Sequence, residues 1–263
     1  MGKLGSRVAL VTAAVLVTGL ERWIPAGRWV LYPFILLTTW VHEMGHGLTA
    51  MALGGKFERL EIFADASGVA FTTASPGLSA ALVALGGLLA PPLLAALILA
   101  FARGPGRAYF CLMALSFGLG ASLVFWVRSF VGIVAVPGLA LVLALGANVG
   151  GGRLRLLAAQ FVAVILGLDT VTRMLHYVFI ERVQAGATAG GRSDVGAVAD
   201  NLGGPYWFWG AMVAGVALLL LLWGLRAAFR GGGAPELEGG RLDGETGAEL
   251  NRAEGAAGRR FRP

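Results

Sequence analysis

Long apolar stretches separated by short polar connections dominate this chain. Each stretch approaches the roughly 20 residues that an α-helix needs to cross a bilayer, and a helix satisfies its own backbone hydrogen bonds inside lipid. The pattern therefore predicts an all-α polytopic membrane protein with about seven transmembrane helices. The predicted spans are residues 8–24, 29–53, 79–101, 109–127, 130–145, 154–180 and 206–225.

One stretch departs from this pattern. Residues 56–73 follow the second predicted span, and Leu60, Ile62 and Ala64 recur there at every second position. A period of two indicates β-strands, and the turn-forming residues 66–68 divide the stretch into two halves. The sequence therefore predicts a small β-hairpin after the second span.

Composition agrees with the membrane class. Hydrophobic side chains make up 57% of the 263 residues, and the mean hydropathy is +0.74. The net charge is +6, but the basic residues form no stripe interleaved with aromatics, so nucleic acid is excluded as a partner. The lipid bilayer is the expected surroundings of the basic loops.

Cys111 is the only cysteine, so no internal disulfide forms. Residues 231–263 are rich in Gly, Ala, Glu and Arg, which predicts a disordered polar tail after a membrane-embedded domain of residues 1–230.

The second predicted span contains His42-Glu43-Met44-Gly45-His46, an instance of the pattern H-E-x-x-H. Residues four apart share one face of a helix, so His42 and His46 can bind the same metal ion. Zinc with three protein ligands and one open position lowers the pKa of a bound water to about 7. Glu43 would take the proton from that water as it attacks a carbonyl. The alternative to a metal site is that these three polar side chains only form hydrogen bonds to neighbouring helices.

A catalytic zinc site needs a third protein ligand. Asp169 lies near the middle of the sixth predicted span, at a depth similar to the two histidines, and is the first choice. Arg173 follows one turn later, so the alternative is an ion pair that only holds helices together. His176 shares the same helix face and could replace Asp169.

The polar connection before the last span offers another alternative. Ser193 is a typical helix cap, and Val195 and Val198 belong to one apolar side of a short amphipathic helix. Asp194 is then either part of the cap or, if this segment folds back over the cavity, the third ligand.

Several strings together resemble one known family. They are HEMGHGLTAMALGG at residues 42–55, a hairpin ending in Gly68-Val69, and GGRSDVGAVAD at residues 190–200, followed by an aromatic cluster. They resemble the site-2-protease-like intramembrane metallopeptidases, and most closely the bacterial branch of that family. The resemblance covers residues 29–225.

The resemblance implies a metallopeptidase-like zinc hydrolase acting on membrane-spanning or membrane-anchored substrates. His42 and His46 match the metal ligands of the family's motif, and Glu43 matches its base. Family members take their third ligand from an aspartate on a later helix, usually in an LDG or NPDG string. Asp169 lies in Leu168-Asp169-Thr170, which lacks that glycine, whereas Asp194 lies in the string typical of the branch.

The leading hypothesis is an intramembrane zinc metalloprotease in a bacterial plasma membrane, with a membrane protein or peptide as substrate. The hairpin would hold that substrate extended along a strand edge, or would be an ordinary interfacial hairpin without substrate contact.

The main alternative function is that of a non-catalytic membrane protein that keeps the metal site to bind client proteins. A protease of the CAAX-processing kind would need a glutamate as third ligand, for which the sequence offers Glu181. Membrane orientation and oligomeric state do not follow from the sequence.

Overall fold

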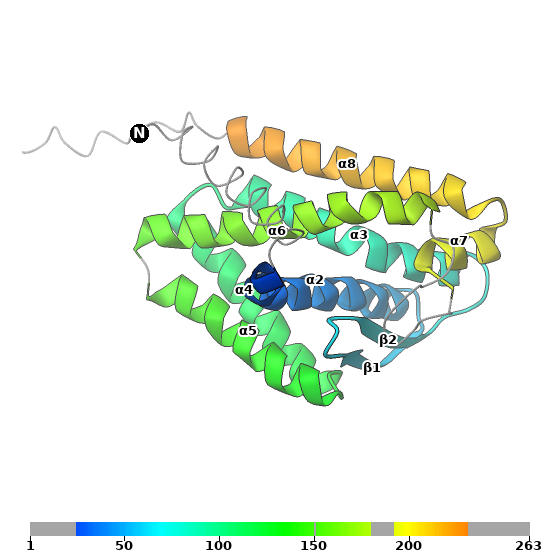
Figure 1. Cartoon of the computed structure of the whole chain (residues 1–263), viewed down its shortest axis with the longest axis horizontal. Coiled ribbons are helices and arrows are strands. Elements are labelled where there is room, and N and C mark those ends of the chain that lie inside the picture. Colours follow the sequence, from blue (N-terminus) through cyan, green and yellow to red (C-terminus); the bar gives the residue numbers. More distant parts are fainter. Residues whose placement is uncertain (1–24, 150, 180–191, 231–263) are drawn as a thin grey trace, which may run out of the picture. The chain divides into compact units, whose positions relative to one another are not determined.

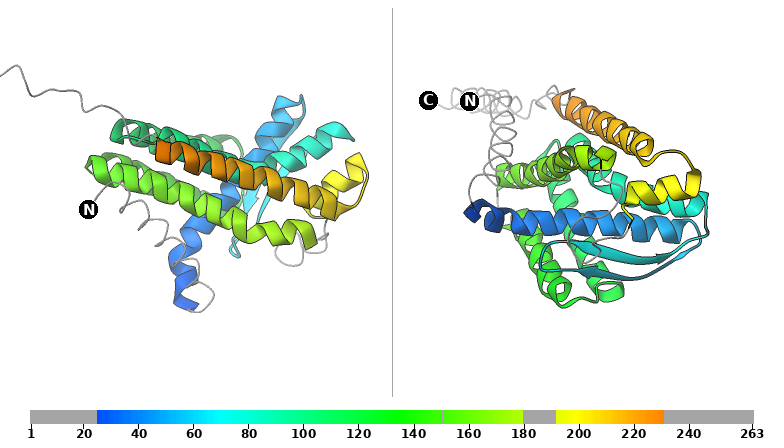
Figure 2. Two further views of the ribbon diagram at one scale, coloured as in Figure 1. Left: turned by 90° about the horizontal axis from the view of Figure 1, so that it is seen from above. Right: turned by 45° about the vertical axis from the view of Figure 1, so that its right-hand side comes forward.

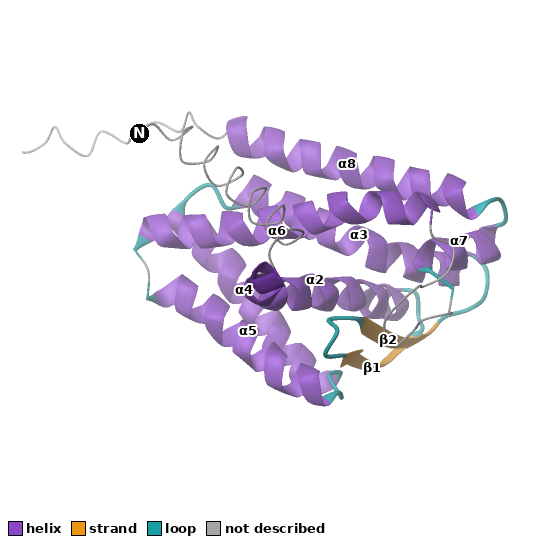
Figure 3. Ribbon diagram, viewed as in Figure 1, coloured by secondary structure: helices purple, strands orange, loops and turns teal. Residues whose placement is uncertain are grey.

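The structure is a computed structural model, and it describes residues 25–149, 151–179 and 192–230. Helices dominate this part of the chain, and its two strands form one small sheet (Figure 3). The predicted hairpin among helices is therefore confirmed. In chain order, the elements in Figure 1 are α2 (Pro25–Ala52), β1 (Lys56–Ile62), β2 (Gly68–Thr73), α3 (Leu78–Phe101), α4 (Pro105–Phe125), α5 (Phe130–Asn148), α6 (Gly152–Phe179), α7 (Asp194–Leu202) and α8 (Tyr206–Arg230).

Five of the described helices are long and apolar enough to cross a membrane, namely α3, α4, α5, α6 and α8. Two of the seven predicted spans are not among them. The predicted span at residues 8–24 lies outside the described residues, as does the predicted tail at residues 231–263. The second predicted span forms α2, whose mean hydropathy is reduced by two histidines, a glutamate and three threonines.

Glycines allow α2 and α3 to approach closely. A Cβ at Gly45 would lie 2.4 Å from the carbonyl oxygen of Gly86, and a Cβ at Gly86 would lie 2.1 Å from Thr49 Oγ1. Membrane helices commonly pack through small residues, because no hydrophobic effect drives them together inside lipid. This contact places the H-E-x-x-H turn of α2 against the first half of α3.

The two strands pair antiparallel, with Leu60 of β1 opposite Ala70 of β2. The segment between α4 and α5 covers the outer edge of β1. There the Leu60 amide donates to the carbonyl of Trp126 over 2.8 Å, and the Leu60 carbonyl accepts from the amide of Arg128 over 3.0 Å. Within the described residues, no strand pairs with the other edge of β2.

The hairpin is also attached to α2. Thr39 Oγ1 donates to the carbonyl of Ala66 over 2.7 Å in a buried position, and the Tyr32 hydroxyl donates to the carbonyl of Ala64 over 2.9 Å. The right view of Figure 2 shows the hairpin and α7 on opposite sides of the C-terminal part of α2. The H-E-x-x-H turn therefore lies between two elements that come from distant parts of the chain.

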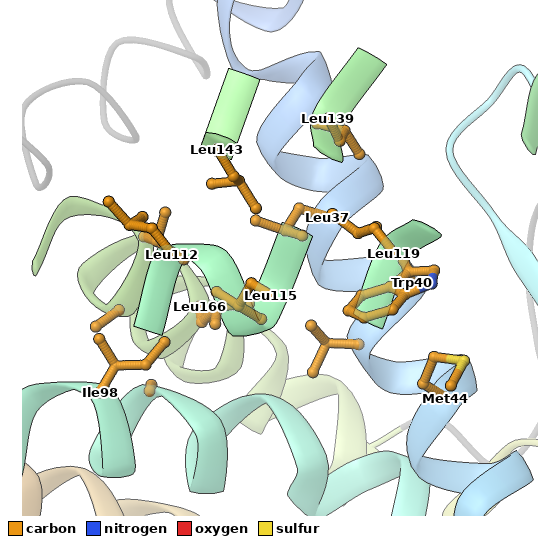
Figure 4. Close-up of a cluster of buried hydrophobic side chains, with 14 of the residues drawn as sticks. Leu37, Trp40, Met44, Ile98, Leu112, Leu115, Leu119, Leu139, Leu143 and Leu166 are labelled. Atoms are coloured by element: carbon orange, nitrogen blue, oxygen red, sulfur yellow. The ribbon is translucent and has the colours of Figure 1, made fainter. Parts of the chain in front are cut away.

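Large apolar side chains pack around the middle of α2. Trp40 belongs to this core, and its indole Nε1 donates to Ser122 Oγ of α4 over 2.8 Å, so its one polar atom is satisfied. The core fixes α2 against its neighbours and hence fixes the direction of the side chains one turn further along. The members labelled in Figure 4 are Leu37, Trp40, Met44, Ile98, Leu112, Leu115, Leu119, Leu139, Leu143 and Leu166.

Candidate metal centre

The side chains of His42 and His46 converge, as their spacing on α2 predicts. Their Nε2 atoms are 3.1 Å apart, and the two rings meet edge to face at 89°. Asp194 of α7 completes the group, with its Oδ2 3.0 Å from His42 Nε2 and 3.4 Å from His46 Nε2. One ligand atom from each of the three residues lies within 4.8 Å of the others. Two imidazole nitrogens and a carboxylate oxygen form a typical donor set for zinc.

A backbone carbonyl orients His46. Its Nδ1 is 2.8 Å from the carbonyl oxygen of Val83 in α3. Because a carbonyl can only accept, Nδ1 donates a proton to it, and in the neutral ring Nε2 is then the nitrogen that can bind a metal. The sequence could not reveal this partner, since every residue has a carbonyl. Only the packing of α2 on α3 brings this carbonyl to the ring.

We expect Gly87→Ala to weaken metal binding, because the His46 ring lies directly on Gly87. A Cβ at position 87 would be 2.1 Å from His46 Nε2, so the ring would have to turn away from its partners. By analogy with the loss of groups that orient metal ligands, zinc affinity should fall by about 10- to 100-fold. The measurement is the zinc retained by purified protein after dialysis against a graded zinc buffer.

Gly138→Ala is the matched control for this prediction. It makes the same change inside α5, where a Cβ would meet no described atom within 4 Å. We expect this variant to retain zinc like the wild type. Equal zinc affinity in the two variants would show that the contact between Gly87 and His46 does not orient the ring.

Local structure and packing hold Asp194 in place. It occupies the first turn of α7, and Ser193 caps that helix by accepting a hydrogen bond from the Gly196 amide over 3.1 Å. Val195 and Val198 are buried against α3 and α8. Burial alone would raise the pKa of Asp194, but the His46 and His42 imidazoles outweigh it and hold the pKa of this carboxyl below its ordinary value. The carboxylate form, which a metal requires, is therefore the stable one.

Asp169, the other aspartate singled out from the sequence, takes a different position. Its Oδ2 accepts from Arg173 Nε over 2.8 Å, so the alternative of an ion pair at i and i+4 is confirmed. Asp169 lines the same cavity as the histidines but is not part of the three-residue group. The side chain of His176 and the whole of Glu181 lie outside the described residues.

Glu43 lies beside this group and is buried, with 6% of its surface exposed. It packs closely against the start of β2, where a Cβ at Gly68 would lie 2.8 Å from Glu43 Cγ and 2.7 Å from Thr39 Cγ2. The cavity next to these residues has a volume of about 900 Å³. Its wall includes His42, Glu43 and His46 from α2, Gly68, Val69, Ala70 and Thr72 from β2, Asp169 and Arg173 from α6, and Asp194 from α7.

A comparison with known families agrees with this geometry. The family model described as Peptidase M50B-like matches residues 8–224, which is most of the chain. No curated protein and no solved structure matches the chain.

Proposed function

The chain belongs to the M50B-like peptidase family, and from this premise we propose that it is an intramembrane zinc metalloprotease. The family match and the five apolar helices make it an integral membrane protein. One observation carries the proposed activity, namely that two imidazoles, the Asp194 carboxylate and Glu43 border the same cavity. A bacterial plasma membrane remains the predicted location.

We assign His42, His46 and Asp194 as the zinc ligands. Support comes from their mutual distances and from the contact of His46 Nδ1 with a carbonyl, which leaves its Nε2 available. Asp194 replaces Asp169 in this assignment because its carboxylate is within 3.4 Å of both rings. Zinc held by three protein ligands supplies a Lewis acid and makes a bound water more acidic.

Glu43 is the proposed general base. As the water oxygen bonds to the carbonyl carbon of the substrate, the Glu43 carboxylate accepts a proton from it. The protonated Glu43 then donates this proton to the amide nitrogen while the C–N bond breaks, which yields a free carboxylate and a free amine. A site that only stores metal needs ligands and no base, so an intact Glu43 supports the protease over the client-binding alternative.

The proposed substrate site is the outer edge of β2. Both backbone groups of Leu60 bond to residues 126 and 128, so Leu60 and Ala70 form a pair without mutual hydrogen bonds. The amide and carbonyl of Ala70 therefore point away from β1, toward the edge that borders the cavity. A substrate unwound from its helix could add there as a further strand, with its backbone next to Glu43.

Removal of the metal tests the proposed function. We expect 1,10-phenanthroline to reduce cleavage of a transmembrane reporter to background, and stoichiometric zinc to restore it, because water without a Lewis acid is a poor nucleophile at neutral pH. The assay uses the full chain in proteoliposomes, with mass spectrometry of the products. A protein that holds one zinc and cleaves none of a panel of transmembrane reporters would favour the client-binding alternative, and cleavage that survives chelation would contradict the metal mechanism.

A further inference from the structure

Two groups of arginines among the described residues differ in whether they contact acidic side chains. No aspartate or glutamate occurs in the sequence between Asp65 and Asp169, and none occurs in α8. Several arginines nevertheless lie in these segments, near the ends of the apolar helices. Five of them are grouped below under the name arginine end, namely Arg103, Arg107, Arg153, Arg155 and Arg226.

The helix packing gathers these residues at one end of the helices. A Cβ at Gly152, at the start of α6, would lie 3.0 Å from Pro105 at the start of α4. Similarly, Gly224 near the end of α8 packs on Ala96 near the end of α3. In Figure 1 the start of α6 and the end of α8 lie on the left, whereas the hairpin and α7 lie on the right. The arginine end is thus remote from the candidate metal centre.

Arginines near the metal centre have acidic partners, which the arginine end lacks. Arg59 pairs with Glu61 over 2.8 Å, Arg173 pairs with Asp169 over 2.8 Å, and Arg192 pairs with Asp200. At the arginine end, the contacts seen among described residues are with rings and carbonyls. Among the described residues, carboxylates therefore pair with three arginines at the hairpin end, where Arg128 contacts only carbonyls, and with none at the arginine end.

Aromatic rings hold two of these guanidinium groups in place. The Arg155 guanidinium carbon lies 5.6 Å from the centroid of the Tyr109 ring, and that of Arg107 lies 5.6 Å from the Phe101 ring. Arg155 Nε is buried and has no hydrogen-bond partner among the described residues. A buried donor without an acceptor is costly, so Arg155 is expected to have an acceptor outside the described residues.

Two helix starts add to the positive potential. Both α4 and α6 begin at the arginine end, and neither has an acidic residue in its first turn. Gly104 occupies the cap position of α4 and offers no side chain to its free amides. Free amides and the helix dipole at such a start favour a bound anion.

We propose that the arginine end binds the phosphate head group of an anionic phospholipid. The helices that carry it cross the membrane, so their ends lie at the level of the lipid head groups. The anion supplies the acceptor that Arg155 lacks, and the ring contacts keep the guanidinium groups turned toward it. The negative charge of the lipid balances five arginines whose segments contain no acidic residue within the described part of the chain.

The first test needs no variant. The full chain is purified in neutral detergent, and bound lipid is counted by native mass spectrometry during titration with phosphatidylglycerol or with phosphatidylcholine. We expect tighter binding of phosphatidylglycerol by about 10-fold or more, because each nearby arginine contributes about fivefold. Equal binding of the two lipids would overturn the proposal. Competition by millimolar inorganic phosphate that removes the bound phosphatidylglycerol would instead identify a site for free phosphate.

Two variants locate the site. Arg107→Gln combined with Arg155→Gln should reduce phosphatidylglycerol binding by about 25-fold, whereas the single variant Arg59→Gln in the hairpin should leave it unaltered. Thermal unfolding in phosphatidylcholine nanodiscs checks that each variant is folded. A loss of about fivefold in Arg59→Gln would show that only overall charge matters. Neither result depends on zinc or on proteolysis, so this proposal and the proposed function can fail separately.

Discussion

Glu43→Gln is expected to reduce cleavage of a transmembrane reporter by about 100- to 10,000-fold while the protein keeps its zinc. Glutamine has nearly the shape of glutamate, so the packing against Gly68 and Thr39 is preserved. Its amide, however, cannot accept a proton from water, and general base catalysis typically contributes this factor. The measurement is single-turnover cleavage in proteoliposomes, combined with metal analysis of the same sample.

Glu58→Gln is the control for this experiment. Glu58 is an exposed residue of β1, so the variant makes the same chemical change outside the cavity. It should cleave the reporter at the rate of the wild type. Wild-type cleavage by Glu43→Gln would exclude Glu43 as the base and remove the main support for the proposed mechanism.

Asp194→Ala is expected to lower zinc affinity by more than about 100-fold, whereas Asp169→Ala should retain zinc. Loss of a direct ligand costs more than loss of a group that orients one, and the latter already costs about 10- to 100-fold. Asp169 makes an ion pair with Arg173, so its removal breaks that pair but leaves the three proposed ligands intact. Competition with a zinc-binding dye measures both variants on one scale.

Substitution of the two aspartates should also affect stability differently, because only one of the two effects depends on zinc. Asp169→Ala breaks a partly exposed ion pair and should lower the unfolding temperature slightly, with zinc present or absent. Asp194→Ala should lower it chiefly in the presence of zinc, because bound metal stabilises the folded state. Zinc loss in Asp169→Ala together with full retention in Asp194→Ala would reverse the assignment.

Local patterns in the sequence were sufficient for the motif and the hairpin. His42 and His46 converge because a spacing of four places two side chains on one face of any helix. The strands follow from a period of two at Leu60, Ile62 and Ala64, and the turn after them ends at Gly68, where the close packing against Glu43 leaves no space for a side chain. Neither inference depends on how distant segments pack.

The third ligand depended on such packing. Asp169 was the first choice because it lies at a similar depth in its predicted span to His42 and His46 in theirs. Side chains at the same depth in the membrane can come into contact. Asp194 instead reaches the histidines from α7, whose apolar face packs on α3 and α8. One local signal predicts this helix, namely the cap at Ser193 followed by apolar valines, but no local signal places the helix over α2. The count of seven spans stays a prediction, since residues 8–24 lie outside the described residues and α2 combines an apolar stretch with the polar residues of its motif.

The proposed zinc ligands are 152 positions apart in the chain, from His42 to Asp194. Because α2 is synthesised before α7, a nascent polypeptide that does not yet include Asp194 contains only two of the three proposed ligands. On the proposed assignment, the hydrolytic centre therefore cannot form before α7 has been synthesised.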